Sequence, residues 1–85
     1  MEHKAKIIKV ESMKNEHIEM ISLWATKVEE ETRETLIFYQ KPDKKNEMLR
    51  KLMISCNVAN ICELEGNFVN VESTLSGAFY VTAAK

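Results

Sequence analysis

Eighty-five residues, 45% of them apolar and 29% charged, suffice for one small folded unit, and we expect residues 1–85 to form a single domain. The composition excludes a disordered chain, and the longest uninterrupted apolar run, residues 36–39, is far below the roughly 20 residues that span a bilayer. The charged segment 1–9 is not followed by an export signal, so we expect a cytoplasmic protein with no membrane partner. The formal net charge of −1 lacks the basic excess of proteins that hold nucleic acid by charge alone.

The first predicted strand covers residues 6–11. Val10 stands between polar Lys9 and Glu11, after an apolar pair at positions 7 and 8. This pattern indicates a half-buried strand with a bulge or a change of face near its start.

Residues 15–28 fit two patterns. Some apolar side chains have helical spacing, yet the segment also alternates as a strand would, with Ile21 and Leu23 on one face and Trp24 on the other. Periodicity alone does not decide between helix and strand here.

Residues 33–40 predict a strand more clearly, because a β-branched and aromatic run ends at Lys41 and Pro42. Asp43 is then a candidate helix N-cap. The helix that follows has one apolar face, formed by Leu49, Leu52, Met53 and Cys56 at helical spacing.

Two further strands are expected at the end of the chain. Residues 68–73 alternate apolar and polar side chains after Gly66, and Ser76-Gly77 forms a turn into residues 78–83. The two strands should therefore pair as a hairpin.

The predicted fold depends on whether residues 16–28 form a strand or a helix. If they form a strand, the order is three strands, one helix and two strands, which is the connectivity of an OB-fold. The sequence then predicts a β-rich domain, a five-stranded OB-like Greek-key barrel with one helix between strands 3 and 4. If they form a helix, the protein is instead an α+β domain with two helices on a small antiparallel sheet.

No motif for catalysis, for a cofactor or for a metal ion is found. Cys56 and Cys62 have neither the spacing of a redox pair nor that of a zinc site, and we expect buried, reduced thiols. His3 and His17 are isolated from them and from each other. The acidic run 29–31 is expected to be solvated, so it does not suggest paired catalytic carboxylates, and we expect no enzyme activity.

Strand parity predicts four outward aromatic side chains. With Leu36 and Phe38 facing the core, Tyr39 faces outward, and the same argument applies in the other strands. Exposed aromatic rings let bases stack, and lysines follow the phosphates of a single strand. The candidate nucleic-acid-binding residues are therefore Trp24, Tyr39, Phe68, Tyr80, Lys41, Lys44 and Lys45. The alternative is that the aromatic rings close a core or an interface and that the lysines form a solvated surface.

The motif order is carried by residues 5–12 (AKIIKVES), 49–52 (LRKL) and 64–71 (LEGNFVNV). This layout resembles that of small phage and prophage proteins thought to be OB-type single-stranded DNA-binding proteins. The resemblance extends over most of the chain, and it implies an OB fold and binding of single-stranded DNA.

Two functions follow from these observations. The favoured one is a non-catalytic single-stranded nucleic-acid-binding module of phage or mobile-element type. The alternative is a small protein-interaction module, such as a phage-encoded modulator of a host enzyme. That module would use the same aromatic surface or the acidic edge at 29–34 against a protein partner. A homo-oligomer is compatible with either.

Overall fold

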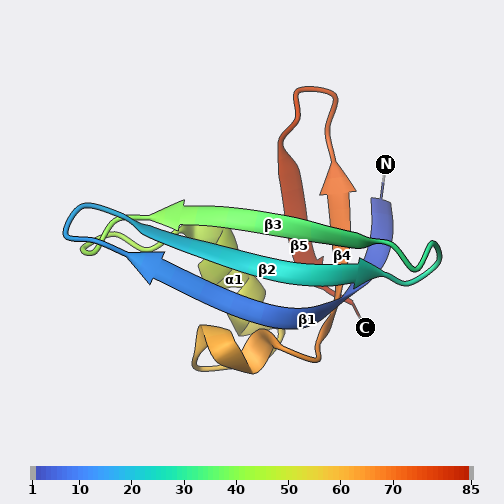
Figure 1. Cartoon of the computed structure of the whole chain (residues 1–85), viewed down its shortest axis with the longest axis horizontal. Helices are drawn as coiled ribbons and strands as arrows, with labels where there is room; N and C mark the ends of the chain where they lie inside the picture. Colours follow the sequence, from blue (N-terminus) through green and yellow to red (C-terminus); the bar gives the residue numbers. More distant parts are fainter. Residues whose placement is uncertain (1, 85) are drawn as a thin grey trace.

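A computed structural model of the chain describes residues 2–84, and these form one antiparallel sheet of five strands with a helix packed against it (Figure 1). The strands are β1 (Glu2–Lys14), β2 (Glu19–Lys27), β3 (Arg33–Gln40), β4 (Phe68–Ser73) and β5 (Phe79–Ala83), and α1 (Glu47–Ser55) and the 3-10 helix η1 (Ile61–Leu64) lie between β3 and β4. The predicted β-rich class is confirmed. Because β2 is a strand, the alternative α+β domain with two helices is wrong. No helix within residues 2–84 has the length and apolar character needed to cross a membrane.

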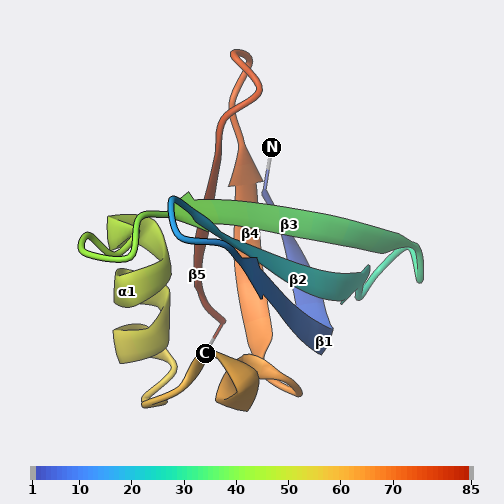
Figure 2. The same ribbon diagram turned by 60° about the vertical axis from the view of Figure 1, so that its left-hand side comes forward.

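β1 is the central strand of the sheet, with β2 on one side and β4 on the other. It pairs with β2 over residues 5–14 and with β4 over residues 2–6, and its register against β2 shifts between Ile7 and Lys9. This is the position at which the sequence predicted a bulge. A bulge bends its strand and increases the local twist, and the β4–β5 hairpin accordingly stands across the direction of β1, β2 and β3 (Figures 1 and 2).

The core fills the space between the inner face of the bent sheet and α1. Its buried side chains are Ala5, Ile7, Ile21, Leu23, Ala25, Leu36, Phe38, Leu49, Leu52, Leu64, Val69, Val71 and Val81. The predicted apolar face of the helix is confirmed for Leu49 and Leu52, whereas Met53 and Cys56 are only half-buried.

The two edges of the sheet are β3 and β5, with the order β3-β2-β1-β4-β5. No strand pairing within residues 2–84 joins these edges, so the sheet is open there. Phe38 of β3 and Phe79 of β5 meet edge to face, with ring centroids 5.6 Å apart. Side-chain packing therefore bridges the gap between β3 and β5 without a shared backbone ladder.

α1 begins later than the sequence predicts. Asn46 is the N-cap, because its side chain accepts a hydrogen bond from the Leu49 N–H at 3.1 Å. The prediction of Asp43 as the cap is wrong, since proline followed by aspartate also suits the middle of a β-turn. Lys44 and Lys45 thus precede the helix.

The prediction of two buried thiols is also wrong. Cys62, in η1, is exposed, and Cys56 is half-buried at the end of α1. Burial raises the pKa of the Cys56 thiol. The sequence did not predict η1, which places Leu64 in the core and turns Cys62 outward.

Candidate nucleic-acid interface

The outward side chains of β1, β2 and β3 form a largely apolar surface, which we call the outer face. In register order its members are Lys9, Glu11, Met13, Met20, Ser22, Trp24, Thr35, Ile37 and Tyr39. Met13, Met20 and Tyr39 form one row across the three strands. The predicted outward direction of Trp24 and Tyr39 is confirmed, since 39% and 55% of their surfaces are exposed.

Residues 41–45 form a short loop at the end of β3, which we call the lysine turn. The N–H groups of Lys41 and Lys44 each donate to the other's C=O at 3.2 Å, so the two residues lie opposite one another. Like charges in this position are destabilising. Within residues 2–84, no ion pair joins Lys41, Lys44 or Lys45 to a carboxylate. The turn contains three lysines and one aspartate, Asp43, so it presents net positive charge to which an anion can bind.

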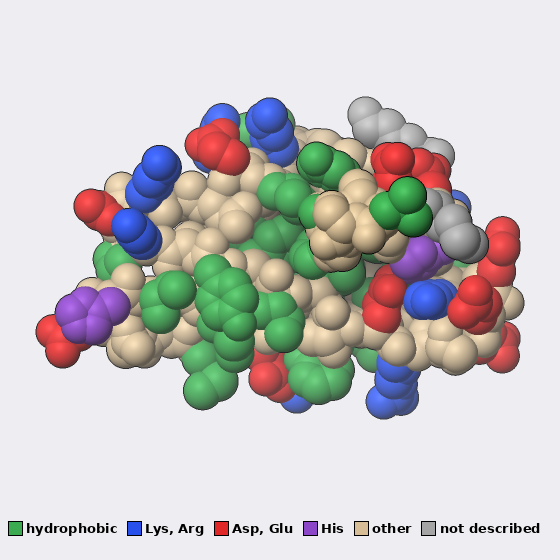
Figure 3. Space-filling view, turned by 90° about the horizontal axis from the view of Figure 1, so that it is seen from above, with side chains coloured by type: hydrophobic (Ala, Val, Ile, Leu, Met, Phe, Trp, Pro, Cys, Tyr) green, Lys and Arg blue, Asp and Glu red, His purple; other side chains and the backbone are tan. Residues whose placement is uncertain are grey.

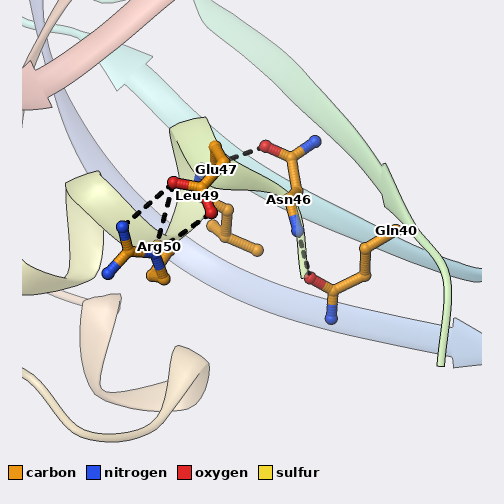
Figure 4. A network of polar contacts seen from close by, with 5 residues as sticks. All are labelled: Gln40, Asn46, Glu47, Leu49 and Arg50. Carbon is orange, nitrogen blue, oxygen red and sulfur yellow. Dashed lines mark hydrogen bonds and ion pairs between the residues drawn. The ribbon is translucent and has the colours of Figure 1, made fainter. Parts of the chain in front are cut away.

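Asn46 fastens the lysine turn to the end of β3. Its N–H donates to Gln40 Oε1 at 3.0 Å, and its Nδ2 donates to the Tyr39 C=O at 3.0 Å. Its Oδ1 is the acceptor that caps α1 at Leu49 (Figure 4). One side chain thus closes the loop against β3 and starts the helix, which fixes the position of the lysines relative to Tyr39.

Glu19 extends this network to β1 and β2. Ser12 Oγ and Gln40 Nε2 each donate to the Glu19 carboxylate at 2.6 Å. The hydrogen bond from Ser12, then that from Gln40, lowers the pKa of Glu19, and the charges of Lys14 and Lys45 act in the same direction. β1, β2 and β3 are therefore tied together at the end of the sheet that carries the lysine turn.

Tyr39 and the lysine turn share a shallow groove of about 470 Å³. The groove is lined by Ile18, Tyr39, Gln40, Lys41, Lys44, Lys45, Asn46, Glu47 and Met48. Its acidic residue, Glu47, is already bound by Arg50, whose Nη2 lies 3.0 Å from Glu47 Oε2 (Figure 4). Apolar walls beside free ammonium groups suit a ligand that combines a flat or apolar part with negative charge.

Phe68 on β4 continues the basic and aromatic surface beyond the bulge in β1. It pairs with Lys6, and the ammonium nitrogens of Lys4 and Lys6 lie 5.4 and 5.8 Å from its ring centroid. Both distances lie within the range of cation–π attraction. Sequence reasoning missed Lys4 because the register between β1 and β4, far apart in the chain, cannot be read from parity.

Tyr80 on β5 faces outward, as predicted, but in acidic surroundings. It pairs with Glu72, which in turn pairs with Glu2 of β1. Carboxylates on the same face repel a phosphate. The structure thus brings Tyr39 together with the lysines, places Trp24 and Phe68 on the adjoining surface, and sets Tyr80 apart.

Charge is separated along the molecule. In Figure 3 acidic side chains are most numerous at the right-hand end, where lysine or arginine side chains also lie, side chains of both signs lie at the left-hand end, and apolar side chains lie between the two ends. The left-hand end carries the lysine turn, and the right-hand end carries the β2–β3 connection with the acidic run 29–31 (Figure 1). The small net charge of −1 therefore combines a lysine-rich turn at one end of the molecule with an acidic loop at the other.

The histidine and cysteine side chains do not assemble into a site. His3 Nε2 lies 2.5 Å from Glu34 Oε1, at the acidic end. Across residues 2–84, no group of three His, Cys, Asp or Glu side chains is arranged to hold a metal ion. The chemistry offered by the described residues is that of the outer face and the lysine turn.

Comparison of the chain with protein-family models, with curated proteins and with solved structures found no match. The resemblance to phage single-stranded DNA-binding proteins therefore stays a prediction. Function has to be argued from the residues of the outer face and the lysine turn.

Proposed function

We propose that the chain is a non-catalytic module that binds single-stranded nucleic acid across the outer face and the lysine turn. The observation that carries this proposal is the groove in which Tyr39 lies beside Lys41, Lys44 and Lys45. None of these three lysines forms an ion pair with a carboxylate within residues 2–84. An exposed ring provides a platform for a base, worth about 1–3 kcal/mol per base, and the ammonium groups hold the adjoining phosphates.

The strand would run from the lysine turn over Tyr39 and Trp24 to Phe68. Tyr39 lies opposite Met20, which is four residues along β2 from Trp24, so the backbone positions of the two aromatic residues are offset by about 13 Å along the strands. The rings are therefore separate platforms that accept unstacked bases. A duplex keeps its bases stacked and paired inside, so the same surface favours single strands.

The arrangement of elements supports an OB-type reading of the sheet. Three strands, a helix and two strands, with β1 between β2 and β4, match the connectivity of that fold. We take the unpaired β3–β5 gap as the opening of a partly open Greek-key barrel. In OB folds the face of strands 2 and 3 binds oligonucleotides, and the outer face occupies this position. Together with the resemblance in layout, this favours a phage or mobile-element type of single-strand binder.

The test is a titration of the protein with a fluorescent oligonucleotide, as a single strand and as a duplex of the same sequence. Single strands should quench Trp24 emission more than the duplex does, because only unstacked bases reach the outer face. The logarithm of affinity should fall with the logarithm of salt concentration with a slope of about −2, since three lysines neutralise about three phosphates.

The double variant Lys44→Ala/Lys45→Ala should flatten that slope by about 1.4 without altering any base preference. Lys51→Ala is the matched control, because Lys51 is an exposed lysine of α1 outside the groove. Absence of binding at low salt, where attraction is strongest, would overturn the proposal.

A protein partner is the second candidate, and a different groove favours it. This groove, of about 430 Å³, lies along α1, and its apolar part includes Met53, Ile54 and Val58. Ile54 is 65% exposed and lies beside the other apolar side chains of this groove. A protein-interaction module, such as a modulator of a host enzyme, would use this surface. Binding of a protein partner becomes the leading candidate function if oligonucleotides leave Trp24 emission unchanged at low salt.

A further inference from the structure

The β2–β3 loop, residues 28–32, is a fixed projection at the end of the molecule opposite the lysine turn (Figure 1). The Lys27 N–H donates to the Thr32 C=O at 2.7 Å, which closes the loop at its base. The Val28 N–H donates to the Lys4 C=O at 2.9 Å, which holds the loop against β1. The loop is therefore presented in one orientation.

The loop carries negative charge and an apolar side chain together. Glu30 Oε2 lies 3.7 Å from Lys27 Nζ, whereas Glu29 and Glu31 have no ion pair within residues 2–84. Val28, at the start of the loop, is 43% exposed. The loop thus offers an apolar contact with unpaired carboxylates beside it.

The groove of the lysine turn is the complement of this loop. It has apolar walls from Ile18, Tyr39 and Met48, and its ammonium groups are unpaired. Carboxylates can occupy the positions that phosphates take beside lysine, because both are anions that accept hydrogen bonds from ammonium groups. The loop and the groove lie at opposite ends of a molecule whose longest extent is 38 Å, so a loop cannot reach the groove of its own chain.

We propose that the groove of the lysine turn binds the β2–β3 loop of a second copy of this chain, which gives a head-to-tail assembly. Such a contact joins two different surfaces, so a row of any length keeps one free groove at one end and one free loop at the other, to which a further copy can bind. The net charge of −1 gives little overall repulsion between copies, and the separated charges favour this one orientation. A single strand in the groove would compete with the loop. The self-association itself does not require nucleic acid, so the two proposals can fail separately.

Sedimentation velocity of the full chain without nucleic acid is the first test. Association should be present at about 50 mM salt and weaken strongly at about 500 mM, because exposed charges are screened within a few ångströms at the higher concentration. A protein that remains monomeric at low salt at all protein concentrations would overturn the proposal.

A charge exchange is the decisive test. Lys44→Glu/Lys45→Glu gives a chain with an acidic groove and an acidic loop, and Glu29→Lys/Glu31→Lys gives a chain with a basic groove and a basic loop. Each variant alone should associate about tenfold more weakly than the wild type, or not at all, because like charges then meet. An equimolar mixture should regain association, since each groove now finds a loop of opposite sign.

The mixture also guards against misfolding, because unfolded variants would not restore one another. Lys51→Glu, on the exposed side of α1 and outside the groove, is the control and should associate like the wild type. Undiminished association of either double variant alone, or failure of the mixture to associate although both variants are folded by circular dichroism, would overturn the proposal.

Discussion

Tyr39 and Tyr80 are two tyrosines with the same exposed fraction, 55%, in opposite electrostatic surroundings. Tyr39 ends the outer face and shares a groove with the lysine turn. Tyr80 lies on the β4–β5 hairpin, in a row with Glu72 and Glu2. Strand parity treats the two residues alike, because both alternate with core side chains.

The comparison shows that an outward ring is only half of a base-binding site. The other half is the charge on the neighbouring strands, which depends on cross-strand register and on the loops that close the sheet. At Tyr39 the register places Met20 alongside the ring, and the lysines come from the loop that Asn46 holds against β3. At Tyr80 the register places the carboxylates of Glu72 and Glu2 in the same row.

Leu52→Ala should have the largest effect, because it removes the support that both surfaces share. Leu52 is 1% exposed in the core between α1 and the bent sheet. Truncation leaves a cavity, so the free energy of unfolding should fall by about 2–5 kcal/mol in urea denaturation. Binding of oligonucleotides should weaken only where the variant is partly unfolded.

Ile54→Ala is the matched control for that experiment. Ile54 lies in the same helix and is 65% exposed, so its loss should change the free energy of unfolding by less than about 0.5 kcal/mol. A fall of under about 1 kcal/mol for Leu52→Ala would mean that the helix packs through another face.

Tyr39→Ala tests the comparison directly. If bases stack on this ring, its removal should weaken single-strand binding by about 1–3 kcal/mol at constant salt, measured by fluorescence titration. Tyr80→Ala removes an equally exposed ring and should change the affinity by less than about 0.5 kcal/mol, because no base is held beside the Glu72 row. Equal losses for the two variants would show that ring exposure alone governs binding.

Much of the fold could be predicted from the sequence because its signals are local. A β-branched and aromatic run predicted β3 at residues 33–40 and alternation predicted β4 at residues 68–73, as observed, and the bulge near Ile7 was also predicted. The start of α1 was not, because the residues at 42 and 43 suit a turn as well as a helix cap. The open β3–β5 gap could not be predicted, since it depends on how far the long sheet bends.

The candidate site shows the same division between local and long-range information. Parity predicted that Trp24, Tyr39, Phe68 and Tyr80 face outward, and all four are exposed. Which of them lie beside lysines depends on pairings between distant strands, such as Phe68 with Lys6 of β1. The hydrogen bonds that join Asn46 to Tyr39 and Gln40 likewise follow no sequence pattern, whereas asparagine is a common N-cap residue and its bond to Leu49 could have been predicted.

The smallest expected effect on stability is that of replacing Glu19. Its hydrogen-bond network ties β1, β2 and β3 together at the end of the sheet that carries the lysine turn, and not at the opposite end. Its carboxylate accepts hydrogen bonds from Ser12 and Gln40, and Gln40 in turn accepts from the Asn46 N–H at the base of the lysine turn. Hydrogen bonds to the ionised form hold the pKa of Glu19 below its ordinary value of 4.5. A carboxyl with a lowered pKa stabilises the fold above the unfolded value, and this stabilisation is lost as the pH falls through the folded value.

Glu19→Gln should therefore lower the free energy of unfolding by about 1 kcal/mol near neutral pH, because Ser12 and Gln40 donate to different oxygens of the carboxylate and an amide has an NH2 group in place of one of them. The difference from the wild type should shrink as the pH falls below 4.5 and should be lost once the pH has passed through the lower pKa of folded Glu19, where the wild-type carboxyl is protonated too. Glu16→Gln, in the exposed β1–β2 loop, is the control for the loss of one negative charge. Because Glu19 supports the lysine turn, its variant should also weaken the contribution of Tyr39 to binding while leaving the surroundings of Tyr80 unchanged. A stability difference that stays constant from about pH 7 to about pH 3 would contradict an ionised Glu19 as the centre of this network.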